Sequence, residues 1–406
     1  MSIVFKILNK LNIDNIILKV ILLFPISTII QGFSIFSPIN KVLTALLMGF
    51  LLLKVMMNLV ERYEIKILAL SVAVFSSSYI GILLCDNFNF NINNLFHYLL
   101  FGLFAIYLIF DHEKFKENLD KEKKLIFYII SIWTIIVIIS FFFKSSYIST
   151  WGDSFYFKSF SEGVPHRFAS SCCLILALTF ILIKDIEKIN KIKIMLFALL
   201  VLPTVCVLLS GARVYLIIAV LTLVIIYHNE CKSEKIFWLT AIPIGVVGIL
   251  AIMISPMGDK MIATATNEHA TNLLAAFTSG RSEFWVYDMD AYFVSDLYYK
   301  IFGSGVSFVF DVNRKMIGNP IYAHNDYINI LMTYGLLGLI EYFVCIIWLV
   351  KTFYEKNKIK SIVGTLSLFG IYFASAFLNG FYVYPCTLLA MPILMYCAQS
   401  KKDKKI

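Results

Sequence analysis

A single histidine lies in a polar cluster near the end of the longest polar stretch of the chain, directly before a long apolar segment. The cluster spans residues 323–327, and the apolar segment carries glycines at 335 and 338. A neutral imidazole at the start of a helix can accept a proton at neutral pH. His324 is therefore a candidate general base at the water-facing end of a rigid apolar helix. The polar neighbours that could support it are Asn325, Asp326 and Tyr327.

Arginine is rare in this chain, with five residues against thirty lysines, and four of the five lie in or beside the segments expected outside a membrane. Arg213 heads an apolar segment after a Ser-Gly turn, Arg281 starts a helical pattern in the longest polar stretch, and Arg167 precedes another apolar segment. The planar guanidinium suits bidentate binding of phosphate. These three are candidate anion-binding residues, although pairing with loop carboxylates remains an alternative. Arg314 is expected to be solvated.

The helical pattern that begins near Arg281 could offer its free N–H groups to an anion. Ser279 or Ser282 is the expected N-cap, and the pattern predicts a helix over about 281–300. Glu283 and Asp326 could orient His324 or bind hydroxyl groups of a substrate. The aromatic side chains of this stretch could pack on the membrane surface or contact a substrate; they are Phe284, Trp285, Tyr287, Tyr292, Phe293, Tyr298, Tyr299 and Tyr322.

The composition is that of an integral membrane protein. Of 406 residues, 60% are hydrophobic and only 15% are charged, whereas about a quarter of the residues of soluble domains are charged. Apolar runs of about 17–25 residues have the length that crosses hydrocarbon as a helix. We therefore predict an all-α polytopic membrane protein with about twelve transmembrane helices. The predicted spans are residues 13–31, 41–60, 65–84, 95–111, 125–143, 168–184, 192–209, 213–228, 236–254, 327–350, 362–378 and 383–398.

The distribution of positive charge predicts the orientation. With both termini in the cytoplasm, the inner segments hold 23 lysines and arginines and the short outer loops hold five. Positive residues are retained on the cytoplasmic side, and long loops do not follow this rule. The chain then divides into spans one to nine (1–254), a large and partly helical outer loop (255–326), and spans ten to twelve with a basic tail (327–406). The net charge of +9 reflects orientation and does not indicate nucleic-acid binding.

The eight cysteines form no Cys-x-x-Cys pair and no cluster with histidine. A structural zinc site needs such spacing. We expect neither a bound metal nor another cofactor, and we expect the cysteines to pack inside the protein.

Four short motifs follow one another in an order that resembles a known family. They are Ser-Gly-x-Arg at 210–213, Ser-Gly-Arg-x3-Trp at 279–285, Gly-x-Gly at 303–305, and His-Asn-x-Tyr at 324–327 followed by Gly-Leu-Leu-Gly. This succession resembles the O-antigen polymerase and O-antigen ligase superfamily of bacterial membrane glycosyltransferases. The motifs cover about residues 165–340, and the layout of spans extends the resemblance to most of the chain.

The resemblance implies a GT-C-like glycosyltransferase in the bacterial cytoplasmic (inner) membrane. Such enzymes join glycans carried on undecaprenyl diphosphate at the outer face, for lipopolysaccharide or capsule. By resemblance, His324 is the essential loop histidine, and Arg213 and Arg281 bind the diphosphate. Arg167-Phe-Ala-Ser lacks the glycine of the family's Arg-x-x-Gly-x-Phe element, so the role of Arg167 is the least supported. Partners would be the lipid-linked donor and acceptor, with a flippase and a chain-length regulator.

Two alternatives stay open. A ligase would transfer the glycan to a lipid or protein acceptor, whereas a polymerase joins repeat units. The richness in Ile, Phe, Lys and Asn is the bias of AT-rich coding DNA, common among polysaccharide-cluster polymerases, and favours polymerase. A flippase or transporter would instead predict internal repeats and paired charges in several spans.

Overall fold

The computed structural model of the chain describes residues 12–398 apart from 63, 85–87, 150–154, 187–189, 232, 266–277, 279 and 358–360. The described part is all-α, with one antiparallel pair of two-residue strands, β1 (Tyr147–Ile148) and β2 (Tyr156–Phe157). Ser279 and most of the segment 266–280 lie outside the described residues.

Ten helices of the described part are long and apolar enough to cross a membrane. They are α2 (Ile13–Ile30), α3 (Ile39–Arg62), α4 (Ile65–Leu83), α5 (Phe88–Lys121), α6 (Lys123–Ser140), α7 (Pro165–Ile183), α8 (Lys191–Leu209), α9 (Arg213–Glu230), α10 (Glu234–Met253) and α16 (Asp326–Asn357). The shorter helices are α11 (Pro256–Ala265), α13 (Arg281–Val294), α14 (Leu297–Phe302), α15 (Phe308–Ile317), α17 (Ile362–Leu378) and α18 (Pro385–Cys397).

Every predicted apolar run is a helix. The last two, α17 and α18, have 17 and 13 residues, so the structure supports ten spans by length, and the count of twelve stays a prediction. The helix predicted over 281–300 is two helices, α13 and α14, separated at Ser295 and Asp296.

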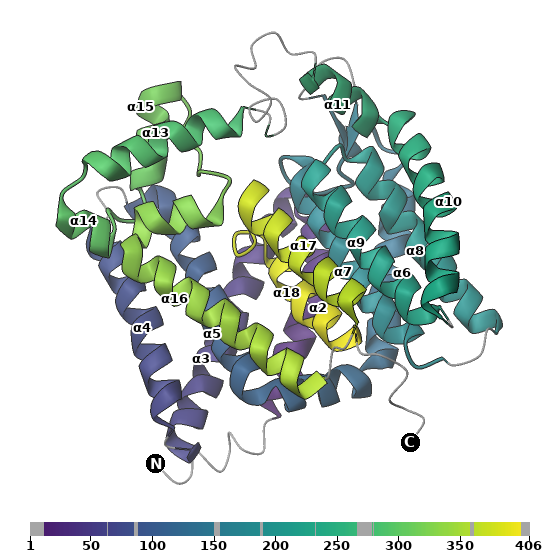
Figure 1. Cartoon of the computed structure of the whole chain (residues 1–406), viewed down its shortest axis with the longest axis horizontal. Helices are drawn as coiled ribbons and strands as arrows, with labels where there is room; N and C mark the ends of the chain where they lie inside the picture. Colours follow the sequence, from purple (N-terminus) through teal and green to yellow (C-terminus); the bar gives the residue numbers. More distant parts are fainter. Residues whose placement is uncertain are drawn as a thin grey trace. The chain divides into compact units, whose positions relative to one another are not determined.

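The chain forms two compact units. The first unit contains residues 1–23, 41–122 and 283–352, and the second contains residues 24–40, 123–282 and 353–406. Both units therefore draw on segments from before and after the predicted outer loop. In the first unit, α13, α14 and α15 lie near the start of α16 (Figure 1).

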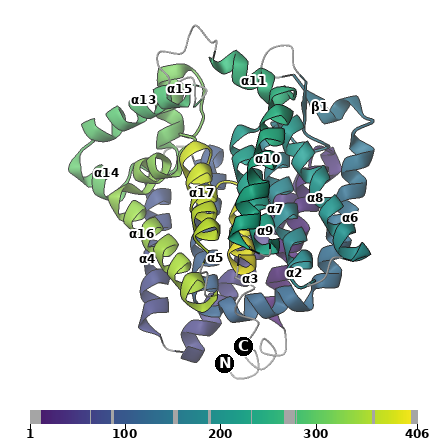
Figure 2. The same ribbon diagram turned by 45° about the vertical axis from the view of Figure 1, so that its right-hand side comes forward.

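The core of the second unit is α7, nearly all of whose side chains are buried. It packs against α8, α9 and α18, and Figure 2 shows α7, α8 and α9 side by side. Ser170, Ser171 and Thr179 each donate a hydrogen bond of 2.6–2.8 Å to a carbonyl three or four residues earlier. Burying these hydroxyls costs little because they are satisfied within the helix.

In the first unit, α16 is broken at Gly335, whose φ and ψ are 69° and −167°. The hydroxyl of Tyr342 donates to the carboxylate of Asp326 at 3.3 Å, although the two residues are 16 positions apart. In a straight helix, they would lie about 24 Å apart along the axis. The expectation of one rigid helix after His324 is therefore wrong. The second part of α16, after Gly335, is still long enough to cross a membrane.

The Gly-x-Gly motif at 303–305 packs against this break. The backbone N–H groups of Ser304 and Gly305 donate to carbonyls at the end of the first part of α16, at 2.9 and 3.1 Å. A Cβ atom on Gly335 would lie 2.3 Å from the carbonyl oxygen of Ile301. Two glycine motifs that are separate in the sequence thus form one backbone contact, which no side chain could enter.

Candidate functional site

Positively charged side chains gather in the second unit, where helices begin. Arg213 is the first residue of α9, and Arg281 is the first residue of α13. Lys260 on α11 lies close enough that the positive charges of Arg213 and Arg281 influence its pKa. The free N–H groups and the positive dipole at helix starts add to this positive potential. We call Arg213, Lys260 and Arg281 the cation cluster.

Lys260 is held beside the turn that precedes Arg213. Its ammonium group donates a 3.0 Å hydrogen bond to the carbonyl oxygen of Gly211 and lies 5.4 Å from the centre of the Tyr156 ring. Burial, and then the charges of Arg213 and Arg281, lower the pKa of Lys260 to about 7. A buried cation with a pKa near neutrality is typical of an anion-binding or catalytic site.

The Ser210-Gly211 turn, predicted as a tight turn between two spans, has that form. Gly211 has a φ of +62°, a conformation that favours glycine. A Cβ atom there would lie 2.4 Å from the Tyr156 ring. The Ser210 hydroxyl accepts a hydrogen bond from the N–H of Ala212 at 3.3 Å. The turn therefore fixes where α9 and Arg213 begin.

Arg281 is anchored at the end of another helix. Its guanidinium donates a hydrogen bond to the carbonyl oxygen of Leu378, the last residue of α17. The next residue, Asn379, donates to the hydroxyl of Tyr215 at 3.1 Å. The predicted N-cap is wrong for Ser282, which lies inside α13; its N–H instead donates to the hydroxyl of Thr278 at 3.1 Å.

Sequence reasoning missed two members of this region, Lys260 and His166. His166 is 9% exposed, lies in the first turn of α7 and has its ring centre 6.2 Å from that of Tyr215. The signal for it was its position in Pro-His-Arg at the head of a buried span. For Lys260, one of several lysines in a long loop, the sequence offers no comparable signal.

Arg167 points elsewhere. Its guanidinium forms an ion pair with Glu162 at 3.3 Å, and both side chains are about half exposed. Exposed pairs of this kind contribute little stability. The predicted phosphate-binding role of Arg167 gains no support from these contacts, whereas its neighbour His166 faces the interior.

In the first unit, the segment that carries His324 is held by two side chains. The indole N–H of Trp285 on α13 donates to the carbonyl oxygen of Ala323 at 2.7 Å. The amide of Asn313 on α15 donates to the carbonyl oxygen of Ile321 at 3.0 Å. Two helices thereby fix alternate carbonyls of the extended segment just before the histidine.

His324 itself adopts a φ of 54°, which is uncommon for a residue other than glycine and is found at functional sites. Its ring centre lies 4.2 Å from that of Tyr322. The residue is partly exposed, although its Nδ1 atom is buried.

The three predicted supporting residues after His324 have separate roles. The Asn325 side chain accepts hydrogen bonds from the N–H groups of Tyr327 and Ile328, at 3.0 and 3.2 Å, and so caps α16. Asp326 is fully buried and accepts from Tyr342 across the helix break. The Tyr327 ring stacks on Phe343 with centres 5.5 Å apart. These contacts stabilise the start of α16, directly after His324.

Two aspartates of α13, Asp288 and Asp290, have Asp-x-Asp spacing. Asp288 is fully buried and Asp290 is exposed, as expected for helical residues two positions apart, which do not face each other. Burial raises the pKa of Asp288 to about 7, and the amide of Asn313 offsets part of this rise.

The described residues contain no group of three or more His, Cys, Asp or Glu side chains placed to hold a metal ion. Glu283, also on α13, is partly exposed.

Comparisons with known proteins returned no match: no family model and no curated protein sequence is similar to this chain.

Proposed function

We propose that the chain polymerises oligosaccharide repeat units carried on undecaprenyl diphosphate, at the outer face of the bacterial cytoplasmic membrane. The observation that supports this best is the cation cluster at the starts of α9 and α13. Three cations held close together, one with a pKa lowered to about 7, create a positive potential that favours binding of an anion. A diphosphate with a glycan on one side and a lipid on the other suits such a place at the head of the membrane-length helix α9.

The proposed reaction is metal-independent glycosyl transfer with His324 as general base. A hydroxyl oxygen of the acceptor sugar attacks the anomeric carbon of the donor, and the imidazole takes the hydroxyl proton. The bond from the anomeric carbon to the diphosphate oxygen breaks, and the leaving undecaprenyl diphosphate keeps the electron pair. Arg213, Arg281 and Lys260 stabilise the charge that grows on it, which is the usual electrostatic contribution to catalysis.

The twelve-span count and the GT-C-like architecture are part of the same proposal. The ten helices of membrane-spanning length and the two shorter apolar helices among the described residues are compatible with it. O-antigen and capsular polysaccharide are both suitable products. A ligase that transfers the glycan to a lipid or protein acceptor would use the same cations and base. The two activities are distinguished by whether donor repeat units alone are elongated.

The flippase alternative draws on one feature, a buried group of charges in the first unit. The Lys54 ammonium lies 2.9 Å from Asp14 and 3.8 Å from Asp111. A transporter would place such a group near the centre of the membrane. Asp14, however, lies in the first turn of α2, so the group is at the helix end. Its location favours a structural role in joining α2, α3 and α5.

The test is an assay of purified protein in nanodiscs with undecaprenyl-diphosphate repeat units, with and without a chelator. A positioned base contributes about 10²–10⁴-fold to the rate, so His324→Ala should lose elongation by that factor while still binding the lipid-linked donor. Arg213→Lys should lose about tenfold or more, because hydrogen bonds to charged groups contribute roughly 1.5–3 kcal/mol and lysine lacks the guanidinium fork.

Arg167→Lys is the matched control and should elongate normally. Normal elongation by His324→Ala would remove this residue from the mechanism. Loss of wild-type activity on chelation would contradict the metal-independent reaction.

A further inference from the structure

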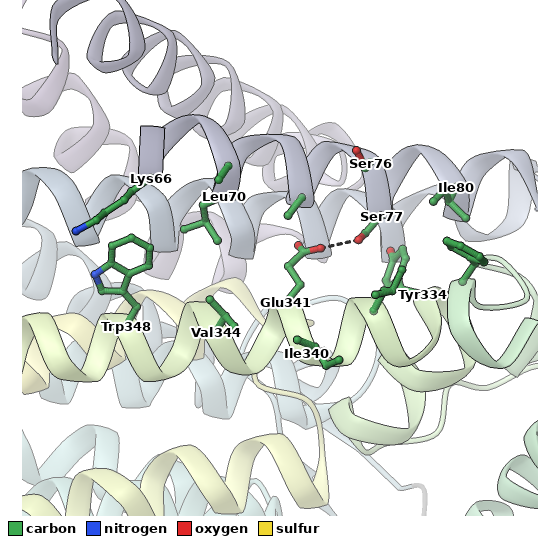
Figure 3. A pocket seen from close by; sticks show the side chains of 14 residues that line it. Lys66, Leu70, Ser76, Ser77, Ile80, Tyr334, Ile340, Glu341, Val344 and Trp348 are labelled. Carbon is green, nitrogen blue, oxygen red and sulfur yellow. Dashed lines mark hydrogen bonds between the residues drawn. The ribbon is translucent and has the colours of Figure 1, made fainter. Parts of the chain in front are cut away.

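A groove of about 510 Å³ lies between α4 and α16 in the first unit (Figure 3). Its size falls within the range of roughly 300–1,000 Å³ that is typical of small-molecule sites, which are mostly apolar with a few polar groups. The groove has this character, because its polar lining is much smaller than its apolar lining. None of the residues assigned to the proposed glycosyl transfer lines it.

Small side chains on one face of α4 create the space. Ala69, Ala73, Ser76 and Ser77 recur at helical spacing along the groove. They face Ile340 and Val344 of α16, which are about half exposed. Both helices have membrane-spanning length and composition, so the groove faces hydrocarbon in a membrane rather than water.

One hydrogen bond crosses the groove. The hydroxyl of Ser77 donates to the carboxylate of Glu341 at 2.5 Å, and Figure 3 shows this bond between the two helices. Glu341 is 8% exposed. Because a carboxyl group is costly among apolar side chains unless it is hydrogen-bonded, this bond is expected to persist. It divides the groove into an apolar section on the side of Lys66 and a second section near Tyr334.

The apolar section ends at a positive charge. Lys66 lies in the first turn of α4 and is exposed, and Figure 3 shows it beside Trp348 at one end of the groove. Lysine and tryptophan at the end of a span are typical of the membrane–water interface. The start of α4 adds the positive end of its dipole. This end of the groove is therefore complementary to an anionic head group.

The length of the section indicates what kind of chain it accepts. Lys66 and Ser77 are eleven positions apart on α4, which corresponds to about 16 Å along the helix axis. Half of the hydrocarbon thickness of a bilayer is about 15 Å. The apolar section thus matches one leaflet, the depth that a phospholipid acyl chain occupies.

We propose that this groove binds one acyl chain of an anionic phospholipid of the surrounding bilayer. The lipid phosphate lies beside Lys66, and the chain ends at the Ser77–Glu341 bridge. The site requires that α4 and α16 lie in a membrane but does not depend on glycosyl transfer, so either proposal can fail alone.

The first test is native mass spectrometry of the purified full chain in detergent, titrated with palmitoyl-oleoyl phosphatidylglycerol or phosphatidylcholine. One phosphatidylglycerol should be retained with about fivefold preference, the effect of one lysine near an anionic lipid. Lys66→Gln should abolish this preference, and the control Lys121→Gln, at an exposed site on α5, should keep it. Ala73→Phe should fill the groove and lower retention at least tenfold. Val72→Phe, on an exposed face of the same helix, should leave retention unchanged.

A second measurement needs no variant. Phosphatidylglycerol with a photoreactive group at the end of one acyl chain should cross-link the wild-type protein within residues 66–77 or 337–348. Cross-links found only elsewhere would overturn the proposal, as would unchanged retention in Ala73→Phe. Displacement of phosphatidylglycerol by equimolar undecaprenyl phosphate would assign the groove to an isoprenoid lipid. Cross-links between two copies through α4 would assign it to a second copy of this chain.

Discussion

Lys260 differs from the two arginines of the cation cluster because its charge depends on pH near neutrality. Its pKa is lowered from 10.5 to about 7 by burial and by the charges of Arg213 and Arg281. The folded protein therefore carries this charge below pH 7 and loses it above. Between about pH 7 and 10.5, the unfolded chain binds a proton that the folded chain does not, so the stability contribution of Lys260 rises with pH in that window.

Anion binding should follow the opposite trend, because it needs the charged lysine. The quantity to compare is the ratio of the pyrophosphate affinity of the wild type to that of Lys260→Arg, a variant that keeps its charge throughout this range. We expect this ratio to fall by about tenfold between pH 6 and pH 8. The reference variant is needed because pyrophosphate itself gains negative charge over this range. The groups close to Lys260 that also contribute charge or polarity are Arg213, Arg281, His166 and Tyr156.

Isothermal titration calorimetry at several pH values measures this ratio. Lys260→Met should bind weakly at every pH, with the same pH profile as Lys260→Arg. A wild-type profile that parallels that of Lys260→Arg would show that Lys260 does not titrate in this range or does not contact the anion.

At the scale of elements, a conservative substitution tests how α13 fixes the segment that carries His324. Trp285→Phe keeps an aromatic ring but removes the N–H that donates to Ala323. An unsatisfied buried carbonyl costs about 1–3 kcal/mol. We expect faster hydrogen exchange over residues 320–325 and a turnover number lowered about tenfold. The KM for the lipid-linked donor should change little, because the cation cluster is intact.

Trp238→Phe serves as the control, since Trp238 on α10 is more than half exposed. It should leave both exchange and turnover unchanged. An equal loss of donor affinity and turnover in Trp285→Phe would indicate a general structural role for this residue rather than positioning of His324.

The break in α16 gives a second prediction at this scale. Gly335→Ala adds a Cβ atom 2.3 Å from a backbone oxygen at a residue with a φ of +69°. Left-handed strain alone costs about 1–3 kcal/mol, and the clash adds to it. We expect a clear fall in the thermal midpoint in detergent, or failure to fold. Gly245→Ala in α10, where nothing lies within 4 Å, should be neutral or stabilising.

The same elements show how far the sequence could be interpreted alone. Hydropathy located all twelve apolar helices, because membrane-length runs are set by composition. The turn before Arg213 was recognisable from Ser210 and Gly211. The fold-back at Gly335 was not, because it depends on backbone contact with the Gly-x-Gly segment. Lys260 and His166 were missed for a related reason: only tertiary packing brings them to the arginines.

At the scale of the whole molecule, the cation cluster belongs to the second unit and His324 to the first. Both must face the compartment that holds the lipid-linked glycan. The charge asymmetry of 23 against five lysines and arginines predicts that residues 255–326 lie outside and that the segment around 111–124 lies inside.

Cysteine labelling of spheroplasts tests this orientation directly. Val294 on α13 and the side chain of Glu117 on α5 are largely exposed, so cysteines placed there should react with maleimides. The background is a variant lacking Cys85 and Cys231, because the other cysteines are buried. A membrane-impermeant maleimide should label position 294 in intact spheroplasts and position 117 only after permeabilisation. Labelling of position 117 alone in intact spheroplasts would place His324 and the predicted outer loop in the cytoplasm, where no outer-face polymerase could use them.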